Sequence, residues 1–386
     1  MAEAVTLAHY ARIAVLARLL PAEDFRVVVA ADPRCRHLDP VPGIEFHPVH
    51  SIPSAQFARA LARGNPVYDA ATLGSYVEED LRLIEAVGPD AVVGDFRISL
   101  GISARRAGVP YLGVADPYWS PRARIAYPVP ELPATRFLPI AWAQRVFDTV
   151  RPLAFRLHAR PYNAVRRRFG LPALVGDVRH VYTDADGLLY AGLPELVEVE
   201  PGEPREHFLG PLLWRPELPL PDWWNDLPTR GPLAYVTLGS SGRTALLAPV
   251  VQALVSLGIT PVVADGGRAG HGAVFRADFL PGEAVIARAS LVVCNGGSPT
   301  CYQALAHGVP VLGLPSNLDQ YLNMSGVARA GAGLLLRADR AAVPAIAAAA
   351  RRLLDEPGCR AAAARLQTAI GERYAAVALR AALGEV

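Results

Sequence analysis

Short apolar runs alternate along this chain with longer segments of helical periodicity, and this alternation limits the folds that the chain can adopt. In the first half, the strand candidates are residues 25–30, 91–94, 111–114 and 187–190. The helix candidates of the same half are residues 10–20, 55–63, 70–87 and 98–107. Strands that alternate with helices are typical of βαβ units, so the pattern predicts an α/β fold with a parallel sheet.

The same pattern begins again after a proline-rich stretch at residues 211–224. The second set of strand candidates is residues 233–238, 260–264, 273–275, 291–294, 311–314 and 333–336. A chain of 386 residues is also longer than one core usually supports. We therefore predict two Rossmann-like domains with parallel sheets facing each other across a cleft. The predicted boundaries are residues 1–208, a linker at 209–228, and residues 229–386.

The start of the chain is unusual for a Rossmann-like domain, because only residues 1–8 precede the first helix candidate. A Rossmann half normally opens with a buried strand. We therefore expect the first strand to be short, partial, or missing because the natural start lies upstream.

Composition excludes several classes of function. With 52% hydrophobic and 19% charged residues the chain is globular, and a net charge of +2 provides no large field that would attract nucleic acid. The four cysteines show no CxxC pair and no spacing with histidine that suits zinc, so we expect reduced, unligated thiols. Because neither a membrane-spanning run nor a signal pattern is found, we expect a cytoplasmic protein with a small-molecule partner and possible peripheral membrane contact.

Three loops of the second half, which follow residues 238, 294 and 314, are expected to bind a ligand. Ligands of parallel sheets lie at the carboxyl ends of strands. Two of them are rich in glycine and lead into helices, whose N-termini suit a diphosphate. For the first, a Gly-Ser turn without a ligand is the alternative. In the second, Pro299 has no N–H, so Thr300 is expected to cap the helix. In the third, Asp319 and Gln320 have the acceptors and donors that paired hydroxyls need.

The segment that runs from Asn295 through Gly308 and Pro315 to Asn323 resembles the donor-site signature of the UDP-glycosyltransferase family. Members of that family are inverting enzymes with the GT-B fold. Residues 233–240 and 162–172 are also similar to family segments, so the resemblance covers most of the chain. Two positions depart from the family pattern, which usually has His in place of Asn295 and Glu in place of Gln303.

The resemblance implies a nucleoside-diphosphate sugar, most often a UDP- or dTDP-sugar, as co-substrate, with no other cofactor. No Asp-x-Asp motif is assigned to hold a cation between phosphates, and no metal is expected. Gln303 would face the ribose, while Asp319 and Gln320 would bind the sugar hydroxyls. The residues implied to cradle the diphosphate are Gly239, Ser240, Ser241, Gly242, Asn295, Gly296, Gly297, Ser298 and Thr300.

Residues 8–17 resemble the family pattern Gly-His-x-x-Pro-x-x-x-Leu-Ala, with Ala8 and Arg12 as departures. By that resemblance, His9 is the general base that deprotonates the acceptor hydroxyl, a task that suits imidazole near pH 7. Asp95 follows the strand candidate 91–94 and would orient His9. The alternative is that Asp95 caps the helix that begins near residue 98. Asp116 is the rival acid, although Pro117 suggests a turn.

Aromatic and polar residues in loops of the first half are weak candidates for the acceptor site, namely Ser54, Tyr118 and Trp119. Residues 117–139 are rich in proline and are expected to be irregular. Their aromatic side chains favour a lipophilic acceptor, but they can equally form core under a long loop. Six arginines lie on or near one helical segment and would either contact anionic lipid or form a solvated face: Arg151, Arg156, Arg160, Arg166, Arg167 and Arg168.

These residues favour one function and leave two alternatives. The favoured function is transfer of a hexose or deoxyhexose from the nucleotide sugar to a hydroxyl of a small or lipophilic acceptor, with inversion. A nucleotide-sugar isomerase of the same fold would need more acids and bases around the sugar than His9 and Asp95. A catalytically degenerate GT-B partner protein is suggested by Asn295 and Gln303.

Overall fold

The structure is a computed structural model. It describes the 386-residue chain except residues 37–40, 42, 133–134, 136, 203–204, 217, 240–241, 265–273, 373–374 and 386. The chain forms two compact units. Unit 1 comprises Met1–Ile125, Gln144–Trp214 and Arg373–Val386, and unit 2 comprises Ala126–Ala143 and Arg215–Glu372. The predicted boundaries 1–208, 209–228 and 229–386 are therefore wrong at two places, because residues 126–143 and the C-terminal segment each belong to the other unit.

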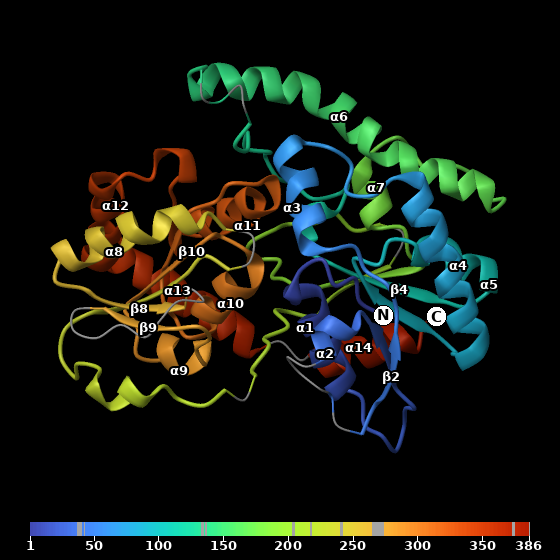
Figure 1. Cartoon of the computed structure of the whole chain (residues 1–386), viewed down its shortest axis with the longest axis horizontal. Helices are drawn as coiled ribbons and strands as arrows, with labels where there is room; N and C mark the ends of the chain where they lie inside the picture. Colours follow the sequence, from blue (N-terminus) through green and yellow to red (C-terminus); the bar gives the residue numbers. More distant parts are fainter. Residues whose placement is uncertain are drawn as a thin grey trace. The chain divides into compact units, whose positions relative to one another are not determined.

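Unit 1 is an α/β unit in which parallel strands alternate with helices along the chain (Figure 1). Its strands are β1 (Val28–Ala31), β2 (Glu45–Pro48), β3 (Val92–Asp95), β4 (Tyr111–Ala115), β5 (Gly187–Tyr190) and β6 (Arg205–Phe208). Its helices are α1 (Leu7–Arg18), α2 (Pro33–Arg36), α3 (Ser54–Arg63), α4 (Ala70–Val87), α5 (Leu100–Ala107), η1 (Pro117–Trp119), α7 (Val178–Tyr182) and α14 (Ala375–Leu383). The long helix α6 (Ile140–Arg168) begins in unit 2 and continues in unit 1.

Residues 1–3 join the two sheets of unit 1. The backbone N–H of Ala2 donates to Ala30 of β1 over 2.9 Å, and that of Glu3 donates to Asp95 of β3 over 3.0 Å. The spatial order is therefore β2, β1, residues 1–3, β3, β4, β5, β6, and the pairings between named strands and the bridge between Ala2 and Asp95 are parallel. In place of a first strand, residues 1–3 form this single bridge, in agreement with the expectation of a short or partial strand. The strand order reverses beside it, which is where Rossmann-like sheets bind ligands.

Unit 2 contains one six-stranded parallel sheet in the order β12-β11-β10-β7-β8-β9. The strands are β7 (Leu233–Thr237), β8 (Thr260–Ala264), β9 (Phe275–Ala277), β10 (Leu291–Cys294), β11 (Val311–Gly313) and β12 (Gly333–Leu335). The helices are η3 (Asp222–Asp226), η4 (Thr244–Leu246), α8 (Leu247–Ser256), α9 (Gly282–Ile286), α10 (Ser298–Ala306), α11 (Leu318–Arg329), η5 (Ala338–Arg340), α12 (Val343–Asp355) and α13 (Pro357–Gly371). The order reverses between β7 and β10, so a ligand crevice is expected there.

In each unit, apolar side chains of the strands pack against helices, as the alternating pattern predicts. Strands β7, β8 and β10 of unit 2 pack with α8 and α12 into one buried cluster, and β10 is buried at every position. All four cysteines are free and buried. Among the described residues, no helix is both long and apolar enough to cross a membrane.

Candidate active site

The structure brings His9 and Asp95 together at the point in unit 1 where the strand order reverses. His9 lies in the first turn of α1, and Asp95 is the last residue of β3. The Nδ1 atom of His9 is 2.8 Å from Oδ1 of Asp95, whose side chain is fully buried. Asp95 does not cap α5, because that helix begins at Leu100 after Ser99. The predicted pair therefore exists as a hydrogen-bonded contact, and its catalytic role stays a prediction.

The contacts of Asp95 decide which imidazole nitrogen carries the proton. A carboxylate can only accept, so His9 Nδ1 must donate at 2.8 Å. Arg12 Nη2 also lies 3.1 Å from Nδ1, but it can place its hydrogen on Asp95 Oδ1, which is 2.9 Å away. With the proton on Nδ1, Nε2 of neutral His9 has a free lone pair. A base acting on a hydroxyl needs this tautomer.

Arg12 is a third member of this cluster, which the sequence analysis treated only as a departure from the family pattern. It lies three residues after His9, on the same side of α1. Its guanidinium donates to Asp95 through Nε over 2.6 Å and to Asp116 through Nη1 over 2.9 Å. Asp116, the rival acid, thus reaches the cluster through Arg12 and not through His9.

Charge explains how Asp95 stays ionised without water. Burial by itself would raise the pKa of Asp95, but Arg12 and then His9 outweigh it, so the pKa lies below its ordinary value of 3.8. Burial also opposes the charge of Arg12, yet Asp95 and Asp116 hold the pKa of Arg12 well above its ordinary value. The cluster therefore contains a permanent carboxylate that accepts from His9 Nδ1.

Aromatic rings extend from His9 along unit 1. The ring of Phe96 stacks on His9 at 4.8 Å and 9°, Tyr182 lies 5.4 Å from Phe96, and Trp119 meets Tyr182 edge-on at 5.0 Å. Phe96 has a φ of 54°, a left-handed backbone that a bulky residue rarely adopts. This turn directly after Asp95 lets the carboxylate and the ring of Phe96 both contact His9. All three aromatic rings are half-buried.

The three acceptor candidates differ in position. Ser54 is exposed at the start of α3, and Trp119 is half-buried at the end of the aromatic row. Tyr118 is 1% exposed, as the alternative of a core residue predicts, and its contact with an acceptor stays a prediction. Pro117, its neighbour in the same short helix η1, is also buried. As predicted, residues 117–139 are otherwise irregular where they are described.

In unit 2, two of the predicted loops meet where the strand order reverses. Cys294 of β10 pairs with Thr237 of β7, so Asn295 and Gly239 follow neighbouring strands. The N–H of Gly297 donates to Asn295 over 3.0 Å, and since an N–H only donates, the atom that it meets is the amide oxygen. The amide nitrogen of Asn295 then lies against Gly239, where a Cβ atom would be 3.3 Å from it. Ser240 and Ser241 lie outside the described residues, between Gly239 and Gly242.

Gly296 occupies a position that only glycine can fill without strain. Its φ is 84°, and a Cβ atom there would lie 2.5 Å from Cγ of Met324. Its carbonyl accepts from the buried amide of Asn323 over 2.9 Å. Asn323 ends the recognised signature and had no predicted role, but it fixes this loop. The backbone of the loop is therefore held rigidly from the α11 side.

The helix that follows this loop begins earlier than expected. α10 starts at Ser298, with Gly297 as its N-cap and no side chain capping it. Thr300 therefore does not cap the helix, contrary to the prediction, and lies in its first turn. Because glycine has no capping side chain, the first N–H groups of α10 are available to an anion. Gln303 lies one turn further on, with its amide oxygen beside Gly282 of α9.

Asp319 and Gln320 occupy different environments in the first turn of α11. Gln320 is 2% exposed, and its side chain accepts from the N–H of Ser316 over 2.9 Å. It also forms a capping box with Asn317: Gln320 accepts from the N–H of Asn317 over 3.4 Å, and its own N–H donates to the side chain of Asn317 over 3.1 Å. Asp319 is half-buried. Gln320 thus fixes the start of the helix, which leaves Asp319 as the more accessible member of the pair.

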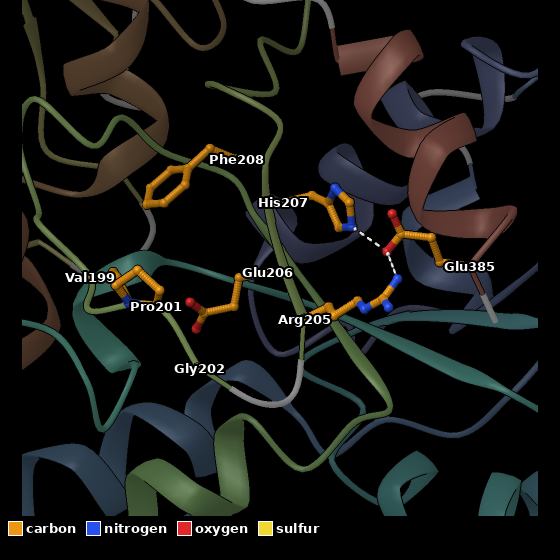
Figure 2. A pocket seen from close by; sticks show the side chains of 8 residues that line it. All are labelled: Val199, Pro201, Gly202, Arg205, Glu206, His207, Phe208 and Glu385. Atoms are coloured by element: carbon orange, nitrogen blue, oxygen red, sulfur yellow. Dashed lines mark hydrogen bonds and ion pairs between the residues drawn. The ribbon is translucent and has the colours of Figure 1, made fainter.

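Two features of unit 1 lie apart from these residues. The expectation that the chain contains no Asp-x-Asp motif is wrong, because Asp184, Ala185 and Asp186 form one. Asp184 pairs with Arg105 and Arg166. A cavity of about 490 Å³ lies beside β6 and contains none of the predicted site residues. Figure 2 shows Arg205 and His207 in its wall reaching toward Glu385, each with a 3.2 Å contact.

The chain has the GT-B fold of glycosyltransferases. In this fold two α/β units each contain a parallel sheet, here with polar loops where the strand order reverses. The glycosyltransferase VinC in complex with dTDP has the same fold, with a TM-score of 0.68, 19% identity, and coverage of 99% of this chain and 98% of that chain. A family described as Erythromycin biosynthesis protein CIII-like, C-terminal domain, matches residues 268–374.

Two relatives are similar over nearly the whole chain. The PGL/p-HBAD biosynthesis glycosyltransferase of Mycobacterium tuberculosis (H37Ra) is 46% identical over 358 residues, which are 91% of this chain and 83% of that protein. The PGL/p-HBAD biosynthesis rhamnosyltransferase of Mycobacterium bovis (BCG) is 45% identical over 359 residues, 92% of this chain and 80% of that protein. The chain belongs to the glycosyltransferase family of these relatives, and it is a glycosyltransferase.

Proposed function

We propose that the protein transfers a deoxyhexose from a nucleoside-diphosphate sugar to a hydroxyl of a lipophilic acceptor, with inversion and with His9 as the base. The observation that carries this proposal is the His9–Asp95 contact at 2.8 Å, which leaves Nε2 as a proton acceptor. Nε2 removes the proton of the acceptor hydroxyl, and the oxygen attacks the anomeric carbon. The imidazolium that forms is stabilised by the carboxylate of Asp95.

The donor is assigned to unit 2. The departing nucleoside diphosphate gains negative charge, which the first N–H groups of α10 and the amide nitrogen of Asn295 can stabilise. Gly239, Gly296 and Gly297 allow the backbone to approach the phosphates closely. Asp319 would accept hydrogen bonds from the sugar.

The acceptor is assigned to unit 1. The half-buried rings of Phe96, Tyr182 and Trp119 form an apolar row that begins at His9. Such a row favours an acceptor with an aromatic or aliphatic body beside its reactive hydroxyl. A 45% identical relative named a rhamnosyltransferase supports a deoxyhexose, and a solved glycosyltransferase of the same fold in complex with dTDP supports a dTDP-linked donor.

A panel of donors and acceptors tests the function. The purified protein is incubated with UDP-, dTDP- and GDP-linked hexoses and deoxyhexoses, with and without hydroxylated aromatic and lipid acceptors. Release of nucleoside diphosphate together with a glycosylated acceptor of inverted anomeric configuration is expected, and it should be fastest with a dTDP-deoxyhexose. Retention of configuration would contradict the single displacement. A sugar isomer, or no product with any pair, would favour the isomerase or the degenerate partner protein.

Asp319→Asn tests the donor assignment. Hydrogen bonds to a charged group are worth about 1.5–3 kcal/mol, so losing the charge should lower kcat/KM for the nucleotide sugar about 10- to 100-fold. The Kd for the free nucleoside diphosphate should stay unchanged, because Asp319 is proposed to contact the sugar alone. Asp355→Asn, on an exposed position of α12, is the matched control and should change neither quantity. A weaker Kd for the free diphosphate in Asp319→Asn would contradict the assignment to the sugar.

A further inference from the structure

One side of α6 carries a row of exposed apolar side chains. Val146, Val150, Leu153 and Leu157 are 51%, 50%, 55% and 39% exposed, and Trp142, one turn earlier, is 61% exposed. Their spacing of three or four residues places them on one face of the helix. At 1.5 Å per residue the row is about 23 Å long. We call these five residues the α6 stripe; α6 is the long green helix in Figure 1.

The stripe is not the face that packs against the rest of unit 1. Ala159, Tyr162 and Val165 are buried among residues of α4, α5 and α7, and Phe155 is buried as well. A surface helix usually has polar residues on its outer side. Since the core already takes one apolar face of α6, the fold itself gives no reason for a second one. A continuous row of exposed apolar side chains on a second face of a helix marks an interaction surface.

Arginines flank the stripe on one side. Arg145, Arg156 and Arg160 are exposed, and each follows a stripe residue by three positions. The sequence of α6 contains seven arginines and one acid, Asp148. Of the basic run noted in the sequence, Arg166 is excluded, because it is 4% exposed and pairs with Asp184. The flank is therefore positively charged, in a chain whose net charge is only +2.

We propose that the α6 stripe and its arginine flank dock on the surface of an anionic lipid bilayer. Apolar residues on one helix face with arginines beside them are the pattern of helices that lie in a membrane interface. Trp142 suits the headgroup level, and the arginines can keep their charged ends in the headgroup region while their stems lie along the apolar row. The docking is peripheral and brings the enzyme to the phase in which a lipophilic acceptor is dissolved. Vesicle binding does not require that the proposed acceptor be correct.

A second copy of the chain is a less suitable occupant. In an isologous pair of antiparallel α6 helices, the arginine flank of one copy would meet the arginine flank of the other. Like charges at that distance repel, whereas anionic headgroups attract the same residues. Charge complementarity therefore favours the bilayer.

Vesicle co-sedimentation of the full chain tests this proposal. Vesicles of phosphatidylcholine alone are compared with vesicles that contain about one third phosphatidylglycerol, at low and at high salt. The wild type should bind the anionic vesicles at least tenfold more tightly, and salt should weaken the binding. Val150→Gln/Leu153→Gln/Leu157→Gln should lower the binding at least tenfold. Arg145→Gln/Arg156→Gln/Arg160→Gln should lower it about 100-fold, since each of the three arginines contributes about fivefold.

Val377→Gln is the matched control, because Val377 is 66% exposed on α14 and lies outside the stripe. It should bind like the wild type. Glutamine is a good helix former, so the variants should keep the thermal midpoint of the wild type. No binding to anionic vesicles, equal binding to both vesicle types, or an equal loss in Val377→Gln would overturn the proposal. So would a wild-type dimer that the triple glutamine variant of the stripe converts to a monomer, because the stripe would then be covered by a second copy.

Discussion

Replacing His9 by alanine is expected to lower kcat roughly 10²- to 10⁴-fold, with little change in the KM for the nucleotide sugar. A general base contributes a factor of this size, and alanine has no group that can take the proton of the acceptor hydroxyl. The donor residues lie in unit 2, so donor binding should persist. Initial rates at saturating acceptor, with donor concentration varied, measure both constants.

The folded state should tolerate this change, because Asp95 keeps its two contacts with Arg12. An unchanged thermal midpoint for His9→Ala would show this. His207→Ala is the control, since His207 lies in the wall of the cavity in Figure 2, apart from the predicted site residues, and its side chain contacts the exposed Glu385 over 3.2 Å. It should turn over like the wild type. Imidazole added to His9→Ala should restore part of the rate. If His9→Ala retains the wild-type kcat, His9 is not the base.

Arg12→Leu is expected to destabilise the protein by about 3–5 kcal/mol, because breaking a buried ion pair leaves uncompensated charge. Asp95 is fully buried and Asp116 nearly so, and Arg12 is the cation that both contact. Without the guanidinium, both carboxylates lose the cation that they share. The free energy of unfolding, measured by urea denaturation at pH 7, is the test.

The stability that Arg12→Leu loses should depend on pH, and the direction follows from the pKa of Asp95. In the wild type the pKa of Asp95 is lowered in the folded state, so its ion pair stabilises the protein above the unfolded value of 3.8. That contribution is lost only as the pH falls through the lower folded pKa. In Arg12→Leu, burial is no longer offset by the guanidinium and favours the protonated acid. The difference in unfolding free energy between wild type and variant should therefore be larger at pH 7 than near pH 4.

Two further variants separate charge from packing. Arg12→Lys keeps the cation but cannot donate to Asp95 and Asp116 with the same fork, so it should recover part of the stability. Asp116→Asn in the Arg12→Leu background removes one of the two stranded carboxylates and should also recover part of it. If Arg12→Leu is as stable as the wild type at both pH values, Arg12 is not needed to hold Asp95.

A comparison of the predicted with the observed strands shows where the local sequence pattern is sufficient to locate a strand. The predicted strand 187–190 coincides with β5, 260–264 with β8 and 291–294 with β10, because each contains a buried run of apolar residues. β2 and β6 were not predicted. Their sequences, Glu-Phe-His-Pro and Arg-Glu-His-Phe, are polar, and their side chains are exposed or half-buried at the edges of the sheet. A strand that is not buried carries no apolar signal.

The predicted donor loops could be located from the sequence because their residues are consecutive. Asn295, Gly296 and Gly297 follow a strand and precede a helix within a fixed spacing, and Asp319 follows the next strand in the same way. By contrast, Arg12 contacts Asp95 and Asp116 across 83 and 104 residues of chain. The only local signal for Arg12 is its position three residues after His9, which places both on one side of α1.

The sequence alone therefore determined the α/β class, two repeated sheets, the loops at their strand ends and the pairing of His9 with Asp95. Tertiary structure decided that residues 1–3 pair between β1 and β3, that Arg12 holds Asp95, and that Tyr118 is core. It also decided that α14 returns to unit 1, where Leu379 and Ala382 are buried with residues of β1 and β5. The physical reason is range. Periodicity and turn chemistry act over a few residues, whereas the choice of a distant partner depends on which surfaces remain to be buried and which charges remain to be paired.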